Sequence, residues 1–210
     1  GKISFDDVPA TMDGLDYDAI EVKPIRGVYV ELLDEADQVL QRVKSNENGE
    51  YRFAEIDLSK PVSIRIKAEL IDDEDNWYVR IIDNTRDNRI YAAESEQGTI
   101  ASIGSIRDLN LRSGWTGNGY GEARSAAPFA ILDTIYTLSE RVKAASPNVQ
   151  LEPLNVNWSE RNVPEDGDET IGQVSTDSYF RGAIYLLGAE DVDTAEYDET
   201  VIAHEWVHYF

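Results

Sequence analysis

The stretch Gly27-Val28-Tyr29-Val30-Glu31-Leu32 alternates apolar side chains with partly polar ones, which is the period of a half-buried β-strand. After it, Asn48-Gly49 favours a tight hairpin turn before Tyr51-Arg52-Phe53. No long helical pattern interrupts the other short extended runs, at 38–44, 64–68, 78–82, 89–91 and 106–111. Residues 1–113 are therefore predicted to form an antiparallel β-sandwich with Val28, Val30 and Leu32 facing inward.

The same segment resembles the transthyretin-like, carboxypeptidase-regulatory-like modules of bacterial surface proteins. In those modules a G-V-x-V-x-L strand is followed by an N-G-x-Y-x-F hairpin, a pattern that residues 27–53 match. The resemblance implies a fold and carries no catalytic residues. It implies a role in folding support, spacing or substrate attachment.

Glycine is dense after residue 113, and residues 114–124 are predicted to be a linker between two domains. Its Trp115 and Tyr120 are expected to pack at a domain junction, the alternative being that they stack on a sugar or peptide. Beyond it the pattern predicts one long amphipathic helix, short extended segments and a final helix, at 128–145, 154–158, 170–174, 182–187 and from 193 onward. The fold class is therefore α+β, with two domains.

The last seven residues, His204-Glu205-Trp206-Val207-His208-Tyr209-Phe210, contain the only two histidines of the chain. On a helix, residues i and i+4 lie on one face, so both imidazoles can reach a single ion. Glu205 is rotated by about 100° from His204 and can hold a water on that ion. Tyr197 and Val201 are expected to share the histidine face, while Ile202, Trp206 and Tyr209 anchor the helix in a core. The alternative is a coincidental pair of surface histidines.

Residues 125–210 resemble the N-terminal part of a bacterial zincin metallopeptidase domain, of the gluzincin-like branch. In such domains a backing helix and a twisted sheet support the metal helix, and an edge strand pairs with substrate backbone. The strand at 183–187 is a candidate for that edge, although its apolar character equally suits an interior strand. Val207 is a departure, because such motifs often carry a small residue before the second histidine.

The resemblance implies a peptidase for peptide or protein substrates, with Zn²⁺ on His204 and His208 and with Glu205 as the catalytic base. The third metal ligand is expected beyond Phe210, so the chain is expected to be a fragment that lacks activity by itself. A bacterial extracellular, periplasmic or cell-surface location is implied as well. The rival hypothesis is a non-catalytic extracellular adhesion or binding protein with a degenerate zincin domain, and the sequence after Phe210 would discriminate the two.

Composition limits the remaining classes of function. The net charge of −22 disfavours binding to nucleic acid or to anionic lipid. The absence of cysteine excludes disulfides and thiol catalysis, and no apolar run of about eighteen residues is present to span a membrane. Solvation explains most of the acidic residues. Ca²⁺ is the alternative at two acidic clusters without EF-hand spacing, Asp72-Asp73-Glu74-Asp75 and Asp191/Asp193/Asp198.

Overall fold

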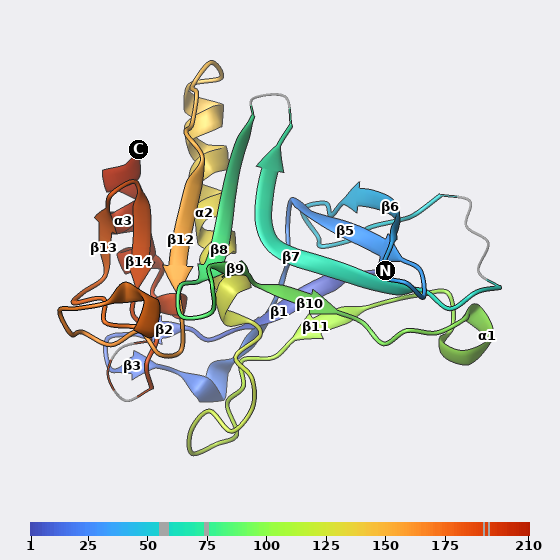
Figure 1. Ribbon diagram of the computed structural model, residues 1–210, viewed down its shortest axis with the longest axis horizontal. Helices are drawn as coiled ribbons and strands as arrows, with labels where there is room; N and C mark the ends of the chain where they lie inside the picture. The colour runs from blue at the N-terminus through green and yellow to red at the C-terminus, as the bar shows by residue number, and fades with distance from the viewer. Residues whose placement is uncertain (55–58, 74–75, 191, 193) are drawn as a thin grey trace.

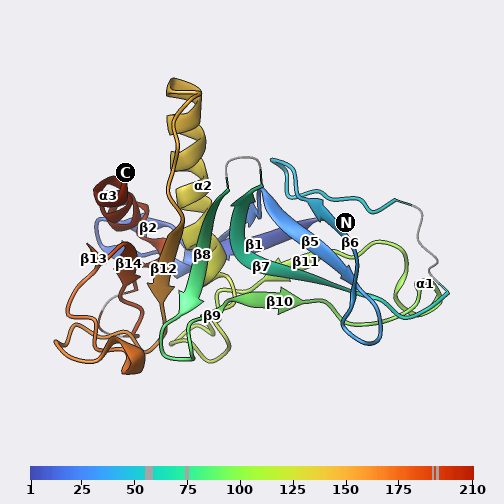
Figure 2. The same ribbon diagram turned by 45° about the horizontal axis from the view of Figure 1, so that its top comes forward.

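The computed structural model describes residues 1–54, 59–73, 76–190, 192 and 194–210. It is mostly β-sheet with a few helices, which confirms the α+β class. Figure 1 shows a long sheet crossing the molecule, with helices α2 (Ala127–Ala145) and α3 (Glu199–Tyr209) together behind one end of it. The turned view in Figure 2 again places both helices on the same face of the sheet.

The large sheet has nine strands among the described residues, in the order β13-β14-β12-β8-β7-β5-β6, with β10 paired to β7 and β9 to β8. Strand pairs are antiparallel from β6 to β8, whereas β12 runs parallel to both β8 and β14. The strand bounds are β5 Val28–Leu33, β6 Val39–Lys44, β7 Ser63–Asp72, β8 Trp77–Asp83, β9 Arg89–Ile90, β10 Ala92–Glu94, β12 Leu154–Trp158, β13 Ser178–Phe180 and β14 Ala183–Leu186.

A second, three-stranded sheet has the order β11-β1-β4, and a small β2-β3 pair stands apart from it. These strands are β1 Ile3–Asp7, β2 Ala10–Thr11, β3 Gly14–Leu15, β4 Glu21–Pro24 and β11 Leu109–Leu111. Residues of β1 share a hydrophobic core with β5 and β7, so the arrangement is sandwich-like. The prediction of a purely antiparallel sandwich is wrong, because β1 pairs with β11 in parallel.

Strand β5 faces the core as its alternation predicts. Val28, Val30 and Leu32 are all buried, whereas Tyr29 and Glu31 are partly exposed. Burying every second side chain against a facing sheet is what a half-buried strand does, and this part of the prediction is confirmed.

Asn48-Gly49 lies in a tight turn, as predicted, but the turn does not close a hairpin. Gly49 N donates to the carbonyl of Asn46 at 2.9 Å, and Gly49 has a φ of 73°. The chain then pairs with the N-terminal segment instead of with β6, since Ile3 N donates to the Gly49 carbonyl at 2.8 Å. A Cβ on Gly49 would lie 2.3 Å from the carbonyl oxygen of Ile3, so this close approach requires glycine.

One sheet runs through both of the segments that were predicted to be separate domains. Strand β8 pairs with β12 in the register Leu154↔Val79, and helix α2 packs on β7 and β8. A single cluster of buried apolar residues extends from β1 to α3. The two-domain arrangement is therefore not confirmed.

The predicted linker folds back on the N-terminal region. Trp115 and Tyr120 bridge each other, and the Tyr17 ring stacks on Trp115 with 3.8 Å between ring centroids. The hydroxyl groups of Tyr17 and Tyr120 lie 2.6 Å apart. The two aromatic residues therefore pack against the chain itself, although the domain junction at which they were expected to pack is not confirmed.

Beyond the connector, helix 128–145 and strand 154–158 are found where they were predicted. The run at 170–174 is not a strand, because a 3-10 turn, Glu169–Ile171, closes there on the side chain of Asp168. Strand β13, which no pattern predicted, pairs with β14 and places β14 inside the sheet. The proposal that 183–187 is the edge strand is therefore wrong, and its interior alternative is confirmed. The other short helical segments are η1 Tyr17–Ala19, α1 Ile100–Ile103 and η3 Ala195–Tyr197.

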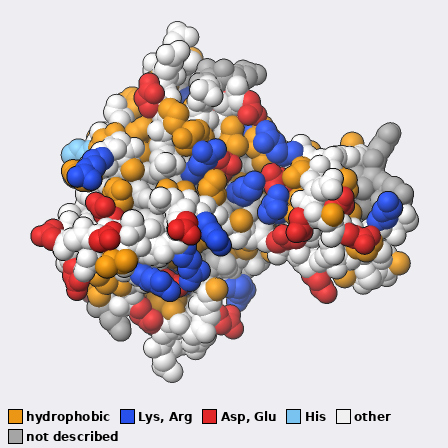
Figure 3. Space-filling model, viewed as in Figure 1, with side chains coloured by type: hydrophobic (Ala, Val, Ile, Leu, Met, Phe, Trp, Pro, Cys, Tyr) orange, Lys and Arg blue, Asp and Glu red, His pale blue; other side chains and the backbone are white. Residues whose placement is uncertain are grey.

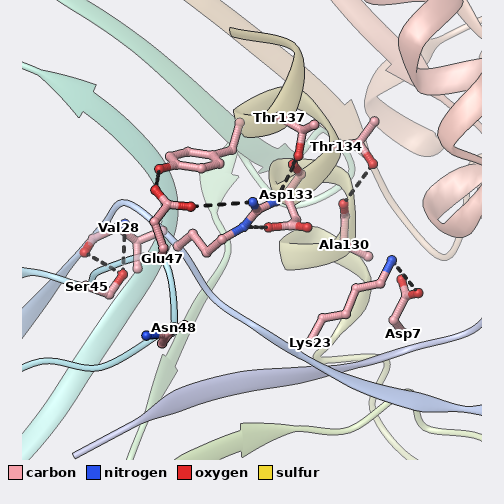
Figure 4. A network of polar contacts seen from close by, with 12 residues as sticks. Asp7, Lys23, Val28, Ser45, Glu47, Asn48, Ala130, Asp133, Thr134 and Thr137 are labelled. Carbon is pink, nitrogen blue, oxygen red and sulfur yellow. Dashed lines mark hydrogen bonds and ion pairs between the residues drawn. The ribbon is translucent and has the colours of Figure 1, made fainter. Parts of the chain in front are cut away.

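Polar contacts attach helix α2 to the sandwich strands (Figure 4). Arg26, just after β4, donates to Asp133 at 2.7 Å and to Thr137 at 2.8 Å, both on α2. Burial raises the pKa of Asp133, with Arg26 opposing the shift. No helix within the described ranges is long and apolar enough to cross a membrane.

Candidate metal site

Helix α3, which carries the two histidines, is capped by Asp198. Asp198 accepts hydrogen bonds from Thr200 N at 2.9 Å and from Val201 N at 3.1 Å, which satisfies two free donors of the first turn. The prediction that the helix begins near residue 193 is wrong, because turn η3 precedes it. Tyr197 lies in that turn, buried, and so does not share the histidine face.

The helix buries one side and exposes the other. Ile202 and Trp206 are buried, as predicted, whereas His204 and His208 are exposed. Figure 3 shows histidine at the molecular surface, on the side where α3 lies. Val207 occupies the position where zincin motifs often carry a small residue. Its side chain is 64% exposed, so the larger side chain does not affect packing in the core.

The two imidazoles converge. His204 Nε2 and His208 Nε2 are 3.1 Å apart, with the ring planes at 82° to each other. Two nitrogens bound to one Zn²⁺ at 2.0–2.1 Å with tetrahedral angles would lie about 3.3 Å apart. The observed separation fits that donor pair closely. The same separation also permits an N–H···N hydrogen bond between the two rings, in which one Nε2 carries a proton. Binding of one metal ion by both rings instead requires each ring to carry its proton on Nδ1 and to leave Nε2 free.

Glu205 lies between the exposed and buried sides of α3. It is 7% exposed, and its carboxylate makes no hydrogen bond or ion pair with any residue that the structure describes. A carboxylate without a protein partner can accept a proton from water. The role of Glu205 as catalytic base stays a prediction.

A third ligand is not found within the described part of the chain. No group of three or more His, Cys, Asp or Glu side chains there could hold a metal ion. Of the calcium candidates, Asp72 pairs with Lys143 at 2.8 Å, Asp73 pairs with Arg42 at 3.4 Å, and Asp198 caps α3. The other candidate residues, Glu74, Asp75, Asp191 and Asp193, lie outside the described residues.

A buried ion pair holds the turn η3 that precedes α3, and no sequence pattern predicted this pair. Arg124 donates to Glu196 of turn η3 and to the carbonyl of Gly188, and the two side chains are only 4% and 0% exposed. The guanidinium also lies 4.1 Å from the ring centroid of Tyr120 and 5.2 Å from that of Trp158. Arg124 therefore attaches both ends of the loop 188–196, through Gly188 and Glu196.

The other end of α3 is anchored to the strands beneath it. Tyr209 OH accepts from Trp77 Nε1 of β8 at 3.2 Å and donates to the carbonyl of Glu152, just before β12. Trp206 stacks on Phe210, with ring centroids 5.4 Å apart. Together with the Asp198 cap, these contacts fix the rotation of the helix and hence the direction in which the histidines point.

One lysine pairs with two carboxylates near the start of α3. Lys23 of β4 pairs with Asp7 at 2.8 Å and with Glu199 at 3.3 Å. Burial opposes the charged form of Lys23, yet its hydrogen bonds to Asp7 and Glu199 raise its pKa. Burial raises the pKa of Asp7 despite that lysine.

The chain matches no protein-family model, no curated protein and no solved structure.

Proposed function

We propose that the protein is a zinc-dependent peptidase whose metal helix is α3. The convergence of His204 Nε2 and His208 Nε2 to 3.1 Å on an exposed face, with Glu205 next to His204, is the observation that supports this most directly. The proposal also rests on the H-E-x-x-H spacing and on the resemblance of residues 125–210 to the zincins.

In this proposal each residue has a distinct chemical task. His204 and His208 bind Zn²⁺ through their Nε2 lone pairs, each in the tautomer with its proton on Nδ1. Bound Zn²⁺ would supply Lewis acidity and lower the pKa of a water molecule. Glu205 would be the base that accepts a proton from that water and returns it to the leaving amine.

Strand β13 is the candidate for holding the substrate. It is an outer strand of the large sheet, antiparallel to β14, and it contacts α3. An extended peptide can pair with such a free strand edge through main-chain hydrogen bonds. Phe180 of β13 is 46% exposed and would contact a substrate side chain there.

Catalysis by this site requires a third protein ligand, which we propose comes from outside the described residues. With two imidazoles alone, metal binding should be weak and turnover negligible. We therefore expect no chelator-sensitive peptidase activity from the 210-residue chain with added zinc. Robust turnover by this chain would show that the site is already complete. If no third ligand exists anywhere in the protein, the rival hypothesis of a non-catalytic binding protein replaces this one.

The decisive experiment measures zinc affinity and peptide cleavage in the same three variants. In the 210-residue chain, His204→Ala and His208→Ala should each abolish zinc binding in a competition titration with a chromophoric chelator, because a single imidazole remains. Glu205→Gln, the matched control, should keep the affinity of the unmodified chain.

Hydrolysis is tested in a form of the protein that binds zinc with three ligands. There Glu205→Gln should retain the metal and lose most cleavage, since a neutral amide cannot accept the proton. Cleavage at the unmodified rate would refute the role of Glu205 as base, and zinc affinity unchanged in both histidine variants would refute the metal site.

The remaining expectations from the resemblance are proposed on the same basis. They are an extracellular, periplasmic or cell-surface location and a polypeptide substrate. Ca²⁺ at the acidic clusters Asp72-Asp73-Glu74-Asp75 and Asp191/Asp193/Asp198 stays a proposal, although the described carboxylates of both clusters already serve in ion pairs or a helix cap.

A further inference from the structure

A cavity of about 450 Å³ is lined by Gly1, by the C-terminal end of β5 and by the N-terminal end of β7. Figure 1 shows these two strand ends on the side of the molecule where the N-terminus lies. The inner surface of the cavity comes from Leu32 of β5, Ile64 of β7 and Val62 just before it, all three buried. Phe53 and Ile106 line it as well, and Ile106 is 69% exposed. The volume and the mostly apolar lining are those of a small-molecule or side-chain pocket.

Two arginines, Arg52 and Arg107, line the same cavity, and among the described residues no acidic side chain lines it. This is unusual in a chain with 41 acidic and only 19 basic residues. Neither arginine forms an ion pair with a carboxylate among the described residues, whereas ten other lysines and arginines do. The two guanidinium groups therefore give the cavity a positive charge that no described carboxylate neutralises by direct contact, although Asp108 and Glu50 act electrostatically on the Gly1 ammonium that also lines it.

Arg107 is held rigidly by neutral groups. Its guanidinium donates to the carbonyls of Gly98 and Ile103, each at 3.3 Å, and to that of Gly104, while its Nε is buried and has no partner in the described structure. Tyr51 OH, in turn, donates to the carbonyl of Arg107. Carbonyl oxygens orient a guanidinium without neutralising it, so the positive charge remains available to an anion.

We propose that this cavity binds a monocarboxylate attached to an apolar group, with the apolar group against Leu32, Ile64 and Phe53 and the carboxylate at the arginines. A planar carboxylate matches the guanidinium fork, and a single negative charge suits walls that are largely apolar. The carboxylate belongs either to a free organic acid or to the C-terminal residue of a polypeptide. The site is separate from the metal helix and does not depend on the peptidase proposal.

The experiment titrates the 210-residue chain with four probes and follows backbone amide shifts by NMR. The probes are 4-phenylbutanoate, its amide, the peptide acetyl-Gly-Gly-Phe with a free carboxylate, and the same peptide amidated. The proposal predicts shifts around residues 51–53, 62–64 and 105–107 for both carboxylates, and affinities at least about tenfold lower for both amides. Tighter binding by the peptide would identify a polypeptide C-terminus as the ligand, and tighter binding by phenylbutanoate a free acid.

Three variants test the charge and the apolar wall. Arg52→Gln should weaken carboxylate binding about tenfold, and Ile106→Glu, a substitution at an exposed position, should abolish it. Arg161→Gln removes an equally exposed, unpaired arginine elsewhere and should change nothing. Arg107 is not substituted, because its contacts support the fold. Equal binding of acid and amide, no binding at about 10 mM probe, or an unaffected Arg52→Gln would each overturn the proposal.

Discussion

Replacing Arg124 with methionine should destabilise the fold strongly, and more at neutral than at acidic pH. The side chain of Arg124 is 4% exposed, and its partner Glu196 is 0% exposed. Methionine fills a similar length without the charge, so Glu196 would remain buried as an unpaired carboxylate. Breaking a buried ion pair from one side costs about 3–5 kcal/mol.

The protonation of Glu196 limits this cost and gives it a pH dependence. A glutamate in the unfolded chain has a pKa of about 4.3, and each pH unit above it is worth about 1.4 kcal/mol. Keeping Glu196 neutral in the folded variant therefore costs about 3.7 kcal/mol at pH 7 and about 1 kcal/mol at pH 5. In the folded variant the buried, unpaired Glu196 has a pKa above that of a glutamate in the unfolded chain. The free energy of unfolding of the variant therefore falls as the pH rises from the unfolded pKa to the folded pKa.

Urea denaturation at pH 5 and pH 7 measures the difference. Arg124→Met should lose about 3–4 kcal/mol relative to the unmodified chain at pH 7 and recover most of that at pH 5. The double variant Arg124→Met/Glu196→Gln has no carboxylate to neutralise, so its loss should be smaller and independent of pH. Two results would refute the view that Arg124 and Glu196 form a buried ion pair in which each charge compensates the other. One is a loss of unfolding free energy under about 1 kcal/mol at pH 7, and the other is an equal loss at both pH values.

Three further perturbations have expected outcomes in the same assay. Asp198→Ala removes the cap of α3 and should cost about 1 kcal/mol, with a loss of helical signal by circular dichroism; no change would refute the cap. Gly49→Ala must hold a φ of 73° and place a Cβ 2.3 Å from the carbonyl oxygen of Ile3, so it should cost at least about 1–3 kcal/mol; a neutral effect would refute the close approach. Because burial raises the pKa of Asp133 above its unfolded value, this group stabilises the fold below about pH 4 and progressively less as pH rises through its folded pKa. The stability of the unmodified chain relative to Asp133→Asn should therefore fall over that window, and a rise would contradict the direction of the shift.

Local patterns predicted the elements well. The alternation at 27–32, the periodicity at 128–145 and the spacing of His204 and His208 each depend on residues a few positions apart. Each of these stretches lies in an element of the expected type, although α3 begins later than predicted. The buried anchors of α3 were predictable for the same reason. A helix with Ile202 and Trp206 on one side must expose the opposite side, where the histidines lie.

Long-range pairing could not be predicted from local patterns. Arg124 and Glu196 are 72 residues apart, and neither differs in its local sequence from the many solvated charges of this acidic chain. Strand β13 is three residues long and has no alternation to reveal it. The N-terminal strand β1 was not predicted, because four of its five residues are buried and it therefore lacks the alternation of a half-buried strand.

The glycine-dense segment at 114–124, which composition predicted to be a linker, is folded against the N-terminal region. Gly114, Gly117 and Gly119 all have positive φ, which serves the tight turn that brings Trp115 against Tyr120. Glycine there permits a sharp reversal next to a core, not a flexible span between two cores. Arg124, at the end of this segment, then reaches Glu196.

The continuity of the sheet also determines how the candidate metal site is supported. Strand β12 lies between β8 and β14, so one of its two hydrogen-bonding edges is satisfied by a strand of the sandwich. Tyr209, one residue past His208, meets Trp77 at the start of that same β8. The face of α3 that carries the histidines is thus positioned by residues from both halves of the chain. Removing the sandwich strands would leave β12 with an unpaired edge and α3 without one of its anchors, so the support of α3 depends on strands from both predicted domains.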